Sequence, residues 1–171
     1  ASEWPVVNTS TQSADIPVSP NAPQTTYGDG GQDAYLFRMN PALSSLQATY
    51  YGGSGADSGY GVQFDSNGQV FTTGGTVSTD LAMPGAPFQG ANSGDADGYV
   101  ARWNSDISSL LSSTYLGTAA FDQSYFVQLG PTNEVFVVGQ THGAYPVSTG
   151  VYSNPGSSQF IHKFSQDLST S

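Results

Sequence analysis

The chain has 171 residues and a mass of 17.8 kDa, enough for one domain with a hydrophobic core. Its formal net charge of −10 comes from 13 acidic and 3 basic residues, so nucleic acid and anionic membrane surfaces are not expected as partners. The absence of cysteine excludes disulfides, thiol catalysis and thiolate metal sites. No apolar run approaches the roughly 18 residues of a membrane-spanning helix.

Short strands are the predicted elements throughout the chain. They are runs rich in β-branched and aromatic residues, separated by clusters of Gly, Pro, Asn and Asp. In chain order they cover 6–11, 33–39, 47–52, 57–64, 70–74, 97–103, 112–117, 122–129, 135–139 and 158–164. Asn67-Gly68 between two of these runs predicts a hairpin with a tight primed turn, because both residues tolerate a positive φ.

An internal repeat organises these strands. Tyr50 returns as Tyr115, which is 115 − 50 = 65 positions later, and residues 57–64 and 70–74 return at the same offset as 122–129 and 135–139. Residues 33–39 occur three times, with copies at 97–103 and 158–164. Four short antiparallel strands that recur with a constant period are typical of the blades of a β-propeller, whereas a β-sandwich of unrelated strands does not predict a repeat.

The predicted fold is therefore all-β, with β-propeller blades of four antiparallel strands and about two and a half to three repeats. It forms one repeat domain over 1–171, divided into a partial blade at 1–47, a second unit at 48–111 and a third unit at 112–171. Closed propellers have four to eight blades, so we expect an incomplete propeller and a fragment of a longer chain. Its expected partners are the missing blades of the same chain or other protein subunits.

Several segments resemble the SBBP family of bacterial β-propeller repeats. They are 113–117 (Ser-Thr-Tyr-Leu-Gly), the glycine-rich stretch 52–62, the strand start 33–35, residues 79–81 with 84–89, and residues 15–18 with 22–24. The third unit departs from this pattern at 119–121 and at 158–159. The resemblance implies a propeller scaffold in a large secreted or cell-surface bacterial protein, often with adhesion domains, and it implies no catalytic residues.

All three basic residues take the same position of the same repeated strand. Because the chain has no other Lys or Arg, we expect each to form a salt bridge with a carboxylate at a blade junction. Anion binding is the functional alternative. These residues are Arg38, Arg102 and Lys163.

Four aspartates also recur at the repeat spacing. An Asp in front of a strand typically accepts hydrogen bonds from the backbone N–H groups of a turn, and this structural role is the prediction for all four. Calcium binding by Asp95 and Asp97 is the alternative, because they supply two hard oxygen ligands next to the turn residue Gly98. The four recurring residues are Asp33, Asp57, Asp97 and Asp122.

No enzyme chemistry, cofactor or metal centre is predicted. His142 and His162 have no second histidine at zinc-ligand spacing, and the only Glu residues are Glu3 and Glu134. There is no nucleophile elbow between a strand and a helix. A propeller hydrolase or lyase would need a cluster of carboxylates or histidines at one mouth of the channel.

The predicted function is a structural or protein-binding module of a secreted or cell-surface bacterial protein, similar to an adhesin. The alternative is a carbohydrate-binding surface, because loop aromatics can stack on sugars and binding residues concentrate on loops. The loop aromatics considered for this surface are Tyr27, Phe88, Tyr145 and Tyr152.

Overall fold

The computed structural model describes residues 4–171, which contain ten β-strands and no α-helix. It follows that no helix in this range is long and apolar enough to cross a membrane. The strands are β1 (Val6–Thr11), β2 (Asp33–Met39), β3 (Leu46–Tyr51), β4 (Asp57–Phe64), β5 (Val70–Thr76), β6 (Asp97–Trp103), β7 (Leu110–Leu116), β8 (Asp122–Leu129), β9 (Val135–Thr141) and β10 (Gln159–Phe164).

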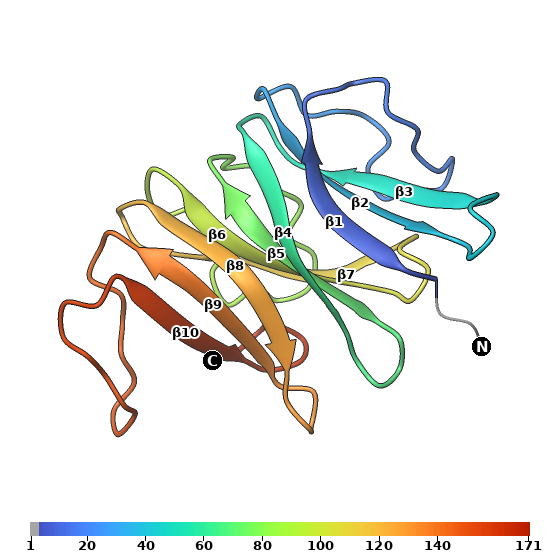
Figure 1. Cartoon of the computed structure of the whole chain (residues 1–171). Coiled ribbons are helices and arrows are strands. Elements are labelled where there is room, and N and C mark those ends of the chain that lie inside the picture. Colours follow the sequence, from blue (N-terminus) through green and yellow to red (C-terminus); the bar gives the residue numbers. More distant parts are fainter. Residues whose placement is uncertain (1–3) are drawn as a thin grey trace.

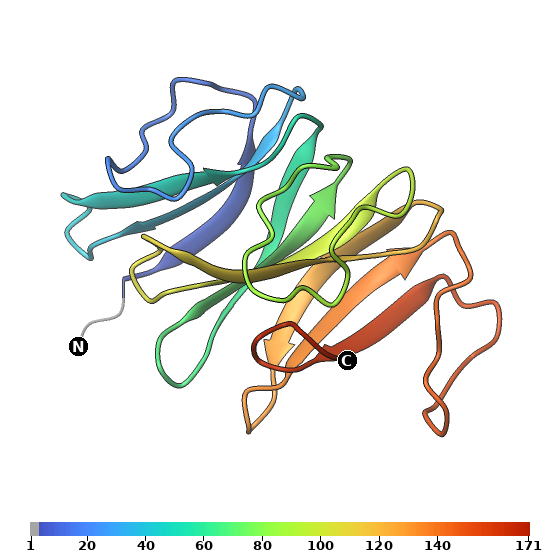
Figure 2. The same ribbon diagram turned by 180° about the vertical axis from the view of Figure 1, so that it is seen from behind.

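The strands form three antiparallel sheets, which confirms the all-β prediction. The first sheet has the order β1-β2-β3, the middle sheet β4-β5-β6-β7 and the third sheet β8-β9-β10. In Figures 1 and 2 the sheets follow one another across the molecule in chain order, from blue through green to red. The predicted boundaries at 47/48 and 111/112 fall inside β3 and β7, because a repeat alone does not say which strands pair.

The repeat is visible in the strand pairing. The β4–β5 register shifts between Gly59 and Gly61, and the β8–β9 register shifts between Ser124 and Phe126, at the same repeat position. The hairpin at Asn67-Gly68 is present, but its predicted primed turn is wrong. Gly68 has φ +77° and donates to the Asp65 carbonyl, while Asn67 has no positive φ. Its tight turn spans 65–68 and leaves a glycine in the left-handed region.

Long loops cover the outer strands of the first two sheets. The loop between β5 and β6 lies along β7, where Pro84 and Gln89 carbonyls accept hydrogen bonds from Ser113 and Tyr115. The loop between β1 and β2 lies along β3 in the same way, with the Gln24 carbonyl accepting from Tyr50. These loops give the outer edge strands hydrogen-bond partners that a sheet edge otherwise lacks.

The hydrophobic core lies between the sheets. One cluster joins the first and middle sheets around Leu36, Tyr99 and Trp103. A second joins the middle and third sheets around Phe71, and its other members include Val100, Val127, Val135 and Phe160. The middle sheet is therefore buried on both faces, and every residue of β5 is buried.

Candidate functional site

The three basic residues do not share one role. Lys163 on β10 lies 3.7 Å from the Glu134 carboxylate and so forms the predicted salt bridge, but Glu134 directly precedes β9 of the same sheet and does not lie at a junction between sheets. The pair is exposed and contributes little to stability. Arg102 on β6 instead donates from Nε to the Gln69 side chain at 2.9 Å. Within residues 4–171 neither Arg102 nor Arg38 forms an ion pair, so the predicted salt bridges are wrong for both arginines.

The repeat explains this difference for Arg102. Gln69 stands at the repeat position of Glu134, 65 residues earlier, so Arg102 meets a neutral amide oxygen where Lys163 meets a carboxylate. Arg38 lies 4.8 Å from the centre of the Trp4 ring and donates to the Ser105 carbonyl. Burial lowers the pKa of Arg38, and the charge of Asp106 opposes this shift.

The four repeated aspartates accept turn hydrogen bonds, as their sequence positions predict. Each is fully buried, and each uses one carboxylate oxygen, Oδ2, for a backbone N–H four or five residues earlier in the chain. The donors are Gly28 for Asp33 at 2.8 Å, Gly53 for Asp57 at 2.8 Å, Ser93 for Asp97 at 2.9 Å and Thr118 for Asp122 at 2.6 Å.

Glutamines that the sequence analysis did not single out extend this arrangement. The Gln89 side chain donates to Asp97 Oδ2 at 2.6 Å and accepts from the Gly117 N–H at 3.1 Å. Gln24 takes the same place at Asp33 and Gly52. Their common position eight or nine residues before an aspartate was the signal that would have found them.

The aspartates meet in two pairs between neighbouring sheets. The Asp57 N–H donates to the Gln32 carbonyl at 2.6 Å, which places Asp57 next to Asp33. The Asp122 N–H donates to the Ala96 carbonyl at 2.7 Å, which places Asp122 next to Asp97. Sequence spacing revealed the four residues but not that they meet across the gaps between sheets.

Burial is the main cause that raises the pKa of Asp57 and of Asp97, each to about 6. The neighbouring carboxyl group of each pair adds to the shift, Asp33 for Asp57 and Asp122 for Asp97. Hydrogen bonds lower these pKa values, from Thr76, Gly53 and Ser78 at Asp57 and from Ser93 and Gln89 at Asp97. Burial also raises the pKa of Asp33.

The residues of the calcium alternative do not lie in a common environment. Asp97 is fully buried and its Oδ2 accepts two hydrogen bonds, whereas Asp95 is exposed. In the part of the chain that the structure describes, no group of three or more His, Asp or Glu side chains is arranged to hold a metal ion.

Three of the four loop aromatics pack against strands instead of forming one sugar-stacking surface. Tyr27 contacts Tyr50 edge-on at 5.9 Å, and Tyr145 stacks on Phe160 at 4.1 Å. Phe88 lies edge-on to Phe164 at 5.6 Å. Only Tyr152 of the four is almost fully exposed, at 93 %.

His162 lies inside the aromatic cluster of β10. Its ring stacks on Phe164 at 4.2 Å, and its Nδ1 is 2.9 Å from the Tyr145 hydroxyl. Its Nε2 is buried and has no hydrogen-bond partner among residues 4–171. Burial lowers the pKa of His162 to about 4, so the ring is neutral at pH 7.

The third sheet has an open face. Burial alternates along β9, whereas β5 at the same repeat position is buried throughout. Ile161 on β10 is 74 % exposed, but its equivalent Val100 is completely buried against the third sheet. Phe126 on β8, the edge strand on the opposite side of the same sheet from β10, is 63 % exposed. Sequence reasoning expected exposed faces but did not assign them to residues.

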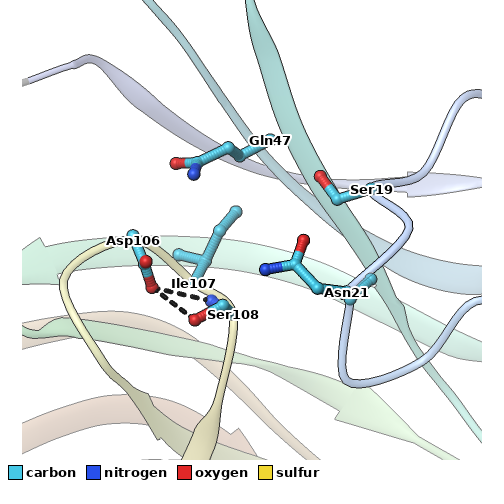
Figure 3. A pocket seen from close by; sticks show the side chains of 7 residues that line it. Ser19, Asn21, Gln47, Asp106, Ile107 and Ser108 are labelled. Atoms are coloured by element: carbon cyan, nitrogen blue, oxygen red, sulfur yellow. Dashed lines mark hydrogen bonds between the residues drawn. The ribbon is translucent and has the colours of Figure 1, made fainter.

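A shallow depression lies between the loop after β1 and the turn between β6 and β7 (Figure 3). Asn21 and Gln47 point toward it, and Asp106 accepts two hydrogen bonds from Ser108 at 3.1 and 2.6 Å. It leaves no enclosed space for a water molecule.

Comparison with known proteins adds no assignment. No protein-family model matches the chain, and no curated protein matches it. The candidate functional features therefore come from the structure: the open face of the third sheet and the two buried aspartate pairs.

Proposed function

We propose that this chain is a set of β-propeller blades that acts as a structural or protein-binding module of a secreted or cell-surface bacterial protein of the adhesin type. The observation that carries the proposal is the open face of the third sheet. The resemblance of the repeated segments to SBBP propeller repeats supports the propeller arrangement and the extracellular location.

The covered face of the middle sheet indicates what kind of structure fits the open face of the third sheet. Val100 and Phe71 are completely buried because the third sheet packs on them through Val127, Val135 and Phe160. Their equivalents on the third sheet are Ile161 and Phe136, which have no such cover among the described residues. A further sheet of the same repeat therefore fits this face, supplied by the same polypeptide or by another subunit.

The chemistry of the face agrees with a protein partner. Ile161 and Phe126 are large apolar side chains with most of their area in solvent, and clustered apolar exposure of this kind marks interaction surfaces. Lys163 and Gln128 are exposed polar side chains on the same face, next to these apolar side chains. The proposal includes no catalytic role and no cofactor.

Self-association of the chain tests this proposal. We expect the wild-type chain to form assemblies whose mass rises with protein concentration, because one copy can cover the open face of another. Ile161→Lys places a charge on the open face and is expected to lower the association constant at least tenfold, about 1.4 kcal/mol. Sedimentation velocity from low to high concentration measures both.

Val151→Lys is the matched control. Val151 is a 57 % exposed apolar residue of the loop before β10, outside the sheet face, and its substitution adds the same charge. Association that is lost equally in both variants contradicts the proposal.

A further inference from the structure

Two pairs of buried aspartates occupy equivalent places between the sheets, Asp33 with Asp57 and Asp97 with Asp122. In each pair the second aspartate donates its backbone N–H to the carbonyl of the residue that precedes the first. At the second junction, Asp97 Oδ1 and Asp122 Oδ2 lie 2.4 and 3.1 Å from the point where a Cβ on Gly117 would stand. The two carboxyl groups therefore converge on the same small space.

Each carboxyl group has one oxygen with hydrogen-bond partners and one without. Oδ2 of every aspartate accepts at least one turn N–H. Oδ1 of every aspartate is buried and accepts no hydrogen bond of full geometry within residues 4–171, although the Thr76 hydroxyl lies close enough to Asp57 to lower its pKa. A buried carboxylate oxygen without a donor is costly, and the same atom is left without one four times. The repetition points to a missing donor that is common to the four sites.

The pairs have no cationic side chain to balance them. The single ion pair of the described residues is Lys163–Glu134, on the surface. The ionisable groups that face the pairs from neighbouring elements are acids, tyrosines and one exposed histidine. These are Tyr27, Asp29, Tyr50, Tyr51, Asp80 and Tyr99 around Asp33 and Asp57, and Tyr115, Tyr145 and His142 around Asp97 and Asp122.

Two adjacent buried carboxylates cannot both keep their charge without a compensating proton or cation. A metal ion such as Ca²⁺ needs six to eight oxygen ligands, and among the described residues no group of three or more His, Asp or Glu side chains is arranged to hold one. A proton needs only two carboxyl oxygens that lie close together, and at the second junction these are Asp97 Oδ1, which has no donor, and Asp122 Oδ2. Protonation of Asp97 Oδ1 turns this oxygen into an O–H donor toward the Asp122 carboxylate.

We propose that each aspartate pair takes up one shared proton in the mildly acidic range, so that one carboxylic acid donates a hydrogen bond to the carboxylate of its partner across the gap between two sheets. The proton comes from solvent and leaves the pair with one negative charge instead of two. The junctions between sheets are therefore tightened by protonation. The raised pKa of Asp57 and of Asp97, each about 6, agrees with this geometry.

Protonation of the pairs makes the stability of the fold depend on pH. The folded-state pKa of these groups lies above the value of about 3.8 in the unfolded chain, so the folded state binds more protons between about pH 4 and 6. The contribution of the pairs to stability is therefore expected to rise as the pH falls from 8 toward 5, opposite in sign to the contribution of His162. Ordinary aspartates that are hydrogen-bonded as anions give the opposite slope.

Asparagine substitutions test the shared proton. In Asp97→Asn the amide oxygen can keep the hydrogen bonds from Ser93 and Gln89, and the amide N–H replaces the proton toward Asp122. We expect the rise of the urea midpoint between pH 8 and pH 5 to fall to about half in this variant. It should be nearly absent in the double variant Asp33→Asn/Asp97→Asn. Asp95→Asn, the same change at an exposed position two residues away, should keep the wild-type slope.

A wild-type slope in the double variant would overturn the proposal. The proposal would also be overturned if millimolar Ca²⁺ raised the urea midpoint of the wild type at pH 8 but not that of the double variant. The pairs would then bind a cation. If the variants do not fold, the ¹³C shifts of the aspartate carboxyl carbons in the wild-type chain decide the matter. The carboxyl carbons of Asp57 and Asp97 should titrate near pH 6, and midpoints that all lie below about 4.5 would overturn the proposal.

Discussion

His162 shows at the scale of one residue how a repeat position can acquire a new property. Its equivalents are Phe37 and Ala101, which have no ionisable group. On β10 the ring is enclosed by Phe88, Tyr145 and Phe164, which shield it from water. The surroundings disfavour the charged imidazolium, and the folded-state pKa of about 4 lies below the ordinary value of 6.5.

Acid should destabilise the fold through this histidine. Because its folded pKa is lowered, stability present above pH 6.5 is lost as the pH falls toward 4, opposite in sign to the aspartate pairs. We expect His162→Phe to be more stable than the wild type at pH 4.5 by about 1 kcal/mol, since partial solvent exposure screens the effect. Urea unfolding at pH 4.5 and 7.5 measures it. A variant whose advantage is no larger at pH 4.5 than at pH 7.5 would contradict this.

At the scale of elements, the long loops serve as the edges of the sheets. Gln89 connects the loop between β5 and β6 to three groups: its backbone carbonyl accepts from Tyr115, and its side chain joins Gly117 and Asp97. Gln24 repeats these contacts in the first sheet. Loop length is tolerated here because hydrogen bonds hold the loop against an outer strand.

Removing the Gln89 side chain should loosen one loop while the sheets stay formed. Gln89→Ala leaves the Gly117 N–H and the Asp97 carboxylate without their side-chain partners, at an expected cost of about 2 kcal/mol. Hydrogen exchange should become faster at Gly117 and along residues 78–96. Gln128→Ala, at an exposed strand position, is the control and should change stability by less than about 0.5 kcal/mol. Equal losses in both variants would argue against this role of Gln89.

At the scale of the whole molecule, three sheets are stacked through apolar clusters while the net charge is −10. Thirteen acidic groups with three basic ones repel one another more in the folded state, where they are closer together, than in the expanded chain. Burial of the middle sheet on both faces opposes this repulsion.

Added salt should therefore stabilise the protein. Raising NaCl from 10 to 200 mM at pH 7.5 shortens the screening length, and we expect the melting temperature to rise by about 2–4 °C. Calorimetry at low protein concentration measures the shift without contributions from self-association. KCl should act equally, and a melting temperature that falls with either salt would show that attraction between charges dominates.

The sequence by itself determined the strands, their repeat and the hydrogen-bonding role of the aspartates. Val70–Thr76 and Val135–Thr141 are strands because β-branched and aromatic residues recur there, and Asp97 caps a turn because its carboxylate reaches the N–H of Ser93 nearby in the chain. These features depend on neighbours along the chain, so they can be read from it.

Only the tertiary structure decided which strands share a sheet, which aspartates meet and which face stays open. Arg102 was expected to meet a carboxylate at a blade junction, but the side chain of Gln69 on the neighbouring strand's turn accepts its hydrogen bond instead. Asp97 meets Asp122, and Ile161 is exposed where Val100 is buried, because of how whole sheets stack. Such contacts join residues far apart in the chain, and local propensity does not carry that information.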